Sequence, residues 1–131
     1  LFEFYVFSKL KERFTQHKEV TYHKRFNYLE PDYIVKTNNG EYKMVVDAKY
    51  KPQYKEGNIS TEDVRQVSGY ARLKKVYDFL EFEDDKVIDC LVIYSNQTAN
   101  REDFKGDNFF LEQEKEYNRF YKIGIELPSI E

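Results

Sequence analysis

The fold is decided by residues 32–49, which read DYIVKTNNGEYKMVVDAK. Asn38-Asn39-Gly40 is a hairpin turn signal, because Asn and Gly accept the positive φ that such turns require. We therefore expect a short strand over residues 32–37 and its antiparallel partner over residues 41–50. The partner strand is continuously apolar at its centre, which is typical of a strand covered on both faces of a sheet.

The predicted hairpin places two acids opposite each other. Asp32 lies about as far before the turn as Asp47 lies after it, so the two side chains are expected to converge within reach of one cation. Mg²⁺ typically takes one or two carboxylates together with water and substrate oxygens, and the Ala48 carbonyl is a further oxygen ligand. Lys49 points to the same face as Asp47, because strand side chains repeat every two residues. Its ammonium can stabilise charge on a phosphate or orient an attacking water.

The remaining elements are predicted from apolar periodicity, turn residues and capping signals. They are a helix over residues 1–16, a strand over 19–28, a loop over 51–59, a long helix from a Ser60 or Thr61 N-cap to about Leu80, a central strand over 86–94, a polar stretch over 95–118 with a short helix within 108–117, and a last strand over 119–127. The fold class is therefore α/β: a mixed central β-sheet of about five strands flanked by helices, in the order α-β-β-β-α-β-β.

Length and composition limit the class of protein. The 131 residues fit a single domain over residues 1–131, and because the chain opens on Leu1 rather than Met we expect a fragment of a longer chain. No apolar run approaches the roughly 20 residues that span a bilayer, and the sequence contains no basic region followed by an apolar run of the kind that marks a signal peptide. We therefore expect a cytoplasmic protein without membrane contact. The single Cys90 cannot build a disulfide or a cysteine-rich cluster.

Charge is divided unevenly along the chain. Net charge is −3, but residues 1–77 hold 15 Lys/Arg and 10 Asp/Glu, whereas residues 78–131 hold 6 and 14. The basic half contains the Asp-x-Lys triplet, and binding of phosphate needs a local positive surface rather than a basic whole. Solvated surface charge without a ligand is the alternative.

Three further residues are candidates for the same site. Gln66 and Tyr70 share a face of the predicted second helix, where the Gln amide can touch the attacking water or a phosphate. Glu3 lies beside the apolar stripe of the first helix and can accept a hydrogen bond from Lys49 or hold a metal-bound water. Ordinary helix packing, a solvated helix-start acid and a surface ion pair at a strand end are the alternatives.

The two histidines lack partners at ligand spacing. His17 and His23 are therefore interpreted as surface residues.

Taken together, Pro31-Asp32, Asp47-Ala48-Lys49 and Gln66-x-x-x-Tyr70 resemble the PD-(D/E)XK nuclease superfamily. Within it, residues 1–6, 47–51 and 63–72 are similar to McrC, the nuclease subunit of McrBC-type modification-dependent restriction systems. The resemblance covers about residues 1–94. Glu30 departs from the pattern, since a basic or neutral residue is expected before Pro-Asp.

The resemblance implies a restriction-endonuclease-like core and a Mg²⁺-dependent deoxyribonuclease that hydrolyses phosphodiester bonds, with Mn²⁺ as a substitute. It implies Asp32, Asp47 and the Ala48 carbonyl as metal ligands, Lys49 as the catalytic lysine, and Glu3 and Gln66 as accessory residues. DNA and an AAA+ motor subunit are the implied partners, and a dimer is considered for double-strand cleavage.

Other readings stay open at this stage. Lys51, Tyr70 and Arg72 are candidates for contact with DNA, although each can equally be surface or packing. The alternatives in function are a RecB-like nuclease of DNA repair and a non-catalytic DNA-binding or assembly module with a nuclease fold.

Overall fold

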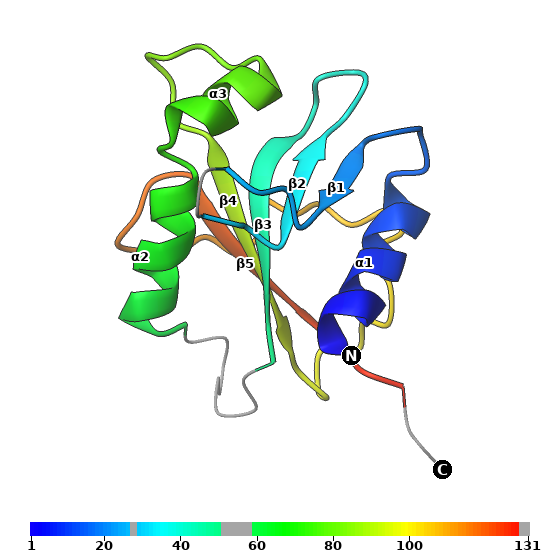
Figure 1. Cartoon of the computed structure of the whole chain (residues 1–131). Helices are drawn as coiled ribbons and strands as arrows, with labels where there is room; N and C mark the ends of the chain where they lie inside the picture. Colours follow the sequence, from blue (N-terminus) through cyan, green and yellow to red (C-terminus); the bar gives the residue numbers. More distant parts are fainter. Residues whose placement is uncertain (27–28, 51–58, 129–131) are drawn as a thin grey trace.

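A computed structural model describes residues 1–26, 29–50 and 59–128 of the chain. Its elements are α1 (Phe2–Arg13), β1 (Val20–Tyr22), β2 (Tyr33–Lys36), β3 (Lys43–Lys49), α2 (Thr61–Tyr70), α3 (Lys74–Leu80), β4 (Asp89–Ser95) and β5 (Phe120–Ile125) (Figure 1). The predicted α/β class, with a five-stranded mixed sheet flanked by helices, is confirmed.

The strands lie in sequence order across the sheet. β1, β2 and β3 pair antiparallel, whereas β3, β4 and β5 pair parallel, so β3 is central and has one neighbour of each kind. The predicted β2–β3 hairpin is confirmed, with Tyr33 opposite Val46. Its turn has Gly40 at φ 76°, and the Thr37 N–H donates to the Tyr42 carbonyl at 2.9 Å.

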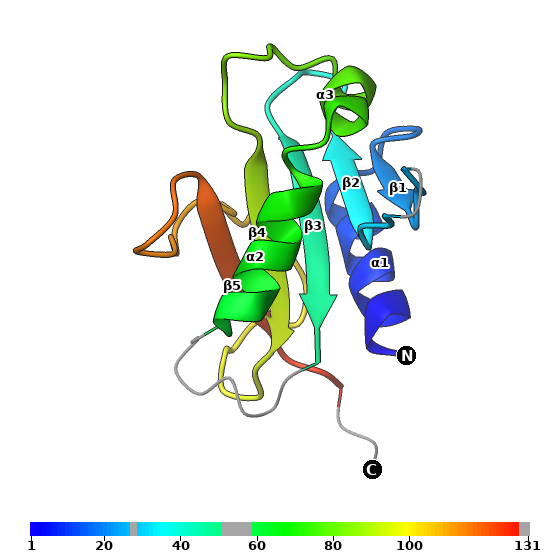
Figure 2. The same ribbon diagram turned by 60° about the vertical axis from the view of Figure 1, so that its left-hand side comes forward.

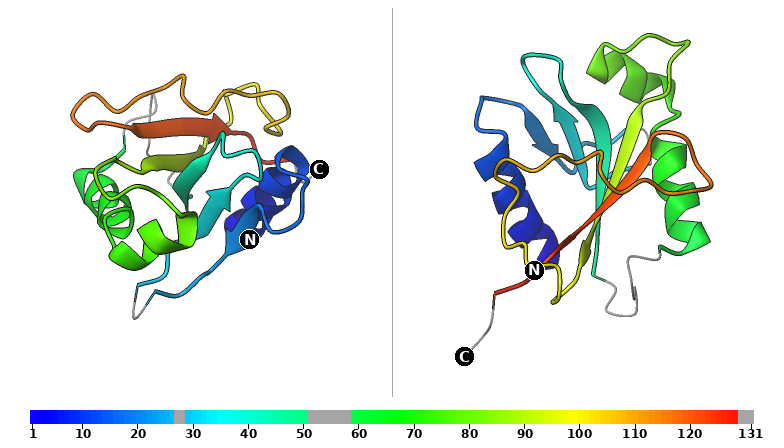
Figure 3. Two further views of the ribbon diagram at one scale, coloured as in Figure 1. Left: turned by 90° about the horizontal axis from the view of Figure 1, so that it is seen from above. Right: turned by 180° about the vertical axis from the view of Figure 1, so that it is seen from behind.

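Helices cover both faces of the sheet. Figures 2 and 3 show α1 on one side and α2 with α3 on the other. Val46 of β3 lies in the same buried cluster as Leu10 of α1, while the neighbouring Val45 lies in the cluster that contains Val67 of α2. Because strand residues alternate between faces, Asp47 and Lys49 lie on the α2 face with Val45.

The single long helix predicted up to Leu80 is wrong, because two helices occupy that region. α2 ends at Tyr70, and Leu73 has extended backbone at φ −71° and ψ 133° before α3 begins. A straight helix of that length would run about 30 Å, beyond a seven-residue strand of about 23 Å. The break keeps both halves over the sheet, since Val64, Val76 and Leu80 are all buried in one cluster.

The helix predicted within residues 108–117 is also wrong. The Asn108 side chain accepts the Phe110 N–H at 2.9 Å, and such local bonds compete with helix formation. Phe104 and Phe109 are buried in the α1-side cluster, and the segment after β4 runs past α1 (Figure 3). Irregular backbone anchored by aromatic side chains therefore covers this part of the sheet.

The strand predicted over residues 19–28 is shorter than expected. β1 ends at Tyr22, because His23 adopts a left-handed backbone at φ 53°. Among the described residues, no helix is both long enough and apolar enough to cross a bilayer.

Candidate functional site

The hairpin brings Asp32 and Asp47 together as the sequence predicts. Asp32 directly precedes β2, one residue before the Tyr33–Val46 pair, and Asp47 directly follows Val46 on β3. Asp32 Oδ2 accepts the Ala48 N–H at 2.8 Å, which fixes the carboxylate against β3. Asp47 is only 3% exposed.

These two acids are held in an environment that disfavours their charge. Burial raises the pKa of Asp32 to about 8, and the adjacent Asp47 and the charge of Glu3 act in the same direction. The hydrogen bond from the Ala48 N–H lowers this pKa but does not offset the burial. Two close carboxylates in a low-dielectric site cannot both ionise without a compensating positive charge. The pair is therefore suited to hold a proton or a cation.

Lys49 lies between β3 and α2. Its Nζ is 2.7 Å from Asp47 Oδ2, 3.7 Å from Asp63 Oδ1, and donates to Gln66 Oε1 at 2.9 Å. Burial lowers the pKa of Lys49, but its contact with Asp47 and the charges of Asp47, Asp63 and Asp32 together raise it above its ordinary value. The side chain is therefore an ammonium that donates hydrogen bonds.

Asp63 lies within this candidate site, although the sequence analysis did not single it out. It lies in the first turn of α2, where its N–H donates to the Ser60 side chain at 3.2 Å, as expected for the predicted N-cap. Asp63 Oδ2 is buried without a hydrogen bond from any described residue, whereas the buried Asp47 Oδ2 has the Lys49 ammonium 2.7 Å away. The signal was its position three residues before Gln66, which puts both on one helix face.

Gln66 and Tyr70 share the face of α2 that lies toward Lys49. Tyr70 is half-buried, and burial, followed by the charge of Asp47, raises its pKa, while a hydrogen bond with Gln66 acts against this. Arg72 is exposed in the turn after α2, and no contact places it in the site. Lys51 lies outside the described residues.

Glu3 lies on α1 and contacts Tyr22 and His23 rather than the expected partner, Lys49. Its Oε2 accepts from the Tyr22 hydroxyl at 3.3 Å and lies 3.0 Å from His23 Nε2. Its backbone carbonyl accepts from the Tyr33 hydroxyl at 2.5 Å. The contacts of the described residues include no hydrogen bond between Glu3 and Lys49, and the other role expected of Glu3, to hold a metal-bound water, stays a prediction.

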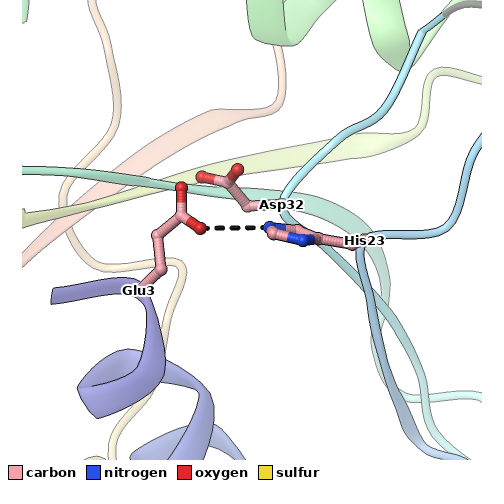
Figure 4. A group of neighbouring side chains, drawn as sticks. All are labelled: Glu3, His23 and Asp32. Carbon is pink, nitrogen blue, oxygen red and sulfur yellow. Dashed lines mark hydrogen bonds and ion pairs between the residues drawn. The ribbon is translucent and has the colours of Figure 1, made fainter. Parts of the chain in front are cut away.

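His23 is exposed, as predicted, but it has partners. Its Nδ1 lies 3.6 Å from Glu30 Oε1, and Glu3, His23 and Asp32 point toward one another (Figure 4). Glu30, which directly precedes Pro31-Asp32, is thus placed beside the histidine.

The site is locally acidic although the first 77 residues are net basic. Its charged and titratable side chains comprise five carboxylates against three basic groups: Glu3, Glu30, Asp32, Asp47 and Asp63 against Lys49, His23 and Arg25, whose Nε lies 3.8 Å from Glu30 Oε2. A phosphate can approach such a surface only when cations offset the negative charge. The overall charge count therefore does not describe this site.

Comparison with known proteins identifies a solved structure with a similar fold. No family model matches the chain, and no curated protein sequence matches it. A solved structure does match, a refined half-complex from the tetradecameric assembly of Thermococcus gammatolerans McrB AAA+ hexamers with bound McrC. The match has 18% sequence identity and a TM-score of 0.56, and covers 98% of this chain and 28% of that chain. The similarity shows a shared fold, and the chain spans about 28% of the length of its match.

Proposed function

We propose that this chain is a divalent-metal-dependent nuclease domain that cleaves DNA within a McrBC-type restriction system. The observation that carries the proposal is the convergence of Asp32, Asp47 and Lys49 on one face of β3, next to Gln66 of α2. The motif resemblance to PD-(D/E)XK nucleases and the fold similarity to a McrB–McrC assembly agree with it.

The carboxylates fit a divalent cation. Asp47 is only 3% exposed and lies beside Asp32, and burial next to Asp47 raises the pKa of the Asp32 carboxyl. Asp32 and Asp47, with the Ala48 carbonyl, would hold Mg²⁺ or Mn²⁺. When bound, the cation lowers the pKa of a water and offsets charge on the phosphate.

The chain's own residues orient the substrate. The Lys49 ammonium is held by Asp47 and Gln66 and carries a fixed positive charge, suited to donate to a phosphate oxygen as negative charge develops there. Since its pKa is raised, Lys49 acts as a donor rather than as a base. The Gln66 amide group, fixed between Lys49 and Tyr70, positions the water that attacks phosphorus while the bond to the leaving sugar oxygen breaks.

Substitution of the lysine tests the proposal. We expect Lys49→Ala in the full-length protein to reduce Mg²⁺-dependent DNA cleavage by about 10²–10³-fold, the loss typical of one transition-state donor. Lys43→Ala is the matched control, because Lys43 lies at the other end of β3, where its Nζ donates to the Glu81 carbonyl at 3.2 Å. Unchanged cleavage by Lys49→Ala and Asp47→Ala would reject catalysis here and leave a non-catalytic DNA-binding module.

An AAA+ motor is the proposed partner. The fold match comes from an assembly of AAA+ hexamers with McrC, and the chain covers a minor part of its match. We expect the full-length protein to co-elute in size-exclusion chromatography with an AAA+ subunit from the same organism in the presence of nucleotide. Robust DNA cleavage without any motor would favour a RecB-like nuclease.

A further inference from the structure

Lys49 has two carboxylates close to its ammonium, and they come from different elements. Asp47 Oδ2 of β3 lies 2.7 Å from Lys49 Nζ, and Asp63 Oδ1 of α2 lies 3.7 Å away. In the proposed function Asp47 is a cation ligand, whereas Asp63 has no assigned part. We propose that Asp63 is a positioning residue, which holds the Lys49 ammonium on the α2 side of the site when Asp47 binds a cation. This role rests on the proposed function.

Asp63 is held in place by the start of α2. Ser60 is the N-cap of the helix, and its side chain accepts the Asp63 N–H at 3.2 Å. α2 lies over β3 and β4 (Figure 2), and Val64, next to Asp63, is buried in the cluster that contains Val45 of β3. The acid therefore lies where helix and sheet meet, and its side chain is only 13% exposed.

The ordinary role of an acid in the first turn of a helix does not account for this placement. Such acids interact with the helix dipole from the surface, and Glu62, the neighbouring acid in the same turn, is exposed. Asp63 is instead buried, and its Oδ2 has no hydrogen bond from any described residue. Burial of a carboxylate is costly unless the charge is paired. Lys49 is the cation that the described contacts place beside Asp63.

Asp63 is placed as a partner of the lysine rather than as a further cation ligand. Among the described residues, the group of three potential metal-binding side chains within 4.8 Å of one another comprises Glu3, His23 and Asp32, and it does not include Asp63. The charge of Asp63 therefore stays available to Lys49 when Asp47 binds a cation. Gln66, the other α2 partner at 2.9 Å, is a neutral amide, so among the described contacts of Lys49 only Asp63 then supplies a negative charge.

Nuclear magnetic resonance of the lysine ammonium groups in the full-length protein tests this role without a cation. Hydrogen bonds slow the exchange of ammonium protons with water, and Lys49→Arg identifies the Lys49 signal by removing it. Asp47→Asn and Asp63→Asn should each raise the exchange rate of this signal by less than about threefold, because one carboxylate remains. The double variant should raise the rate by about tenfold or more, since charge-assisted hydrogen bonds are the strong ones. Glu62→Gln, in the same helical turn, is the matched control and should leave the rate unchanged.

Addition of Mg²⁺ separates this role from the proposed function. In Asp63→Asn, Mg²⁺ should raise the Lys49 exchange rate to about that of the double variant, whereas the native protein should hold the ammonium. Exchange as fast in Asp47→Asn alone as in the double variant would overturn the role of Asp63, whatever the cleavage result. A rate in Asp63→Asn that does not respond to Mg²⁺, with the double variant still fast, would overturn the cation position at Asp47 but not the hold of Asp63 on Lys49.

Cleavage kinetics give a second measurement of the same role. Lys49 acts on charge that develops in the transition state, so Asp63→Asn should lower kcat for Mg²⁺-dependent DNA cleavage by about tenfold. The KM for DNA should change by less than about twofold. An equal loss of kcat in Glu62→Gln would assign the effect to the start of α2 and overturn the positioning role. Circular dichroism of each variant separates loss of position from loss of fold.

Discussion

Two contacts between a buried acid and a base, on neighbouring strands of the sheet, differ in the balance of charge. At the start of β4, Asp89 receives two hydrogen bonds from Arg119, at 2.6 and 3.0 Å. On β3, Lys49 faces Asp47 at 2.7 Å and Asp63 at 3.7 Å. The first contact pairs one acid with one base, whereas the second gives one base to several acids.

The difference separates an ion pair that stabilises the fold from charged residues that are suited to bind a ligand. Burial raises the pKa of Asp89, but the bidentate Arg119 satisfies both of its oxygens, so the pair needs nothing further. Around Lys49, a single ammonium lies 2.7 Å from Asp47 and 3.7 Å from Asp63, and the buried Asp63 Oδ2 has no hydrogen bond from the described residues. An excess of buried carboxylate is costly in the free protein, and it is the state that a cation relieves.

Addition of a divalent cation should give the largest effect. Mg²⁺ or Mn²⁺ at a hundred times its Kd should stabilise the native protein by about 2.7 kcal/mol. This gain should disappear in Asp47→Asn and persist in Asp89→Asn, since only the first removes a proposed ligand. Differential scanning calorimetry with and without the cation measures it. Equal stabilisation of both variants would mean that the cation binds elsewhere.

Removal of Arg119, the base that is paired with Asp89, should give the next largest effect. Arg119→Ala leaves Asp89 buried without a partner and should lower the free energy of unfolding by about 2 kcal/mol. Urea denaturation measures this loss. The double variant Arg119→Ala/Asp89→Asn should recover part of it, because the second change removes the unpaired charge. No recovery would show that Arg119 stabilises through packing instead.

The free energy of unfolding should also depend on pH through Asp32, which lies beside Asp47 without a base of its own. We expect this effect to be smaller than the loss caused by Arg119→Ala. The pKa of Asp32 is raised to about 8 in the folded protein, above about 4 in the unfolded chain. The folded state therefore binds the extra proton between these values, so stability without metal is greatest below about pH 4 and falls as pH rises to about 8. Asp32→Asn should flatten this slope.

At pH 8 the same substitution should stabilise the metal-free protein, because it removes a carboxylate whose charge is disfavoured by burial beside Asp47. Thermal unfolding at pH 5 and pH 8 measures both slope and sign. Destabilisation by Asp32→Asn at pH 8 would show that the hydrogen bond from the Ala48 N–H outweighs the buried charge.

An exposed ion pair should give the smallest effect. Lys36 Nζ lies 3.1 Å from Glu81 Oε2, but the Glu81 side chain is 76% exposed. Lys36→Ala should change the free energy of unfolding by less than about 0.5 kcal/mol in urea denaturation. A loss in the free energy of unfolding as large as that of Arg119→Ala would contradict this expectation. It would mean that burial of the acid does not decide how much an ion pair stabilises the protein.

The hairpin and its acids could be predicted because they depend on local signals. Asn38-Asn39-Gly40 fixes the turn, the turn fixes the register, and the register places Asp32 next to Asp47. Gln66 and Tyr70 followed from helix spacing in the same way. The overall α/β class needed only the order of apolar segments.

The residues that were missed depend on contacts between distant segments. His23 reaches Glu3 and Glu30 because its backbone turns left-handed after β1, and no periodicity signals that turn. Asp63 acts with Lys49 only once α2 packs on β3. The break at Leu73 was hidden because the apolar residues on its two sides still repeat at helical spacing.

The position of β3 in the sheet has a kinetic consequence. Its antiparallel partner pairs Tyr33 with Val46, 13 residues apart, whereas its parallel partner pairs Met44 with Asp89, 45 residues apart. Closing the shorter loop costs less chain entropy, so we expect the hairpin to form before β4 docks. The juxtaposed aspartates would then exist early on the folding pathway, and a cation present at that stage could act as a template for the rest of the domain.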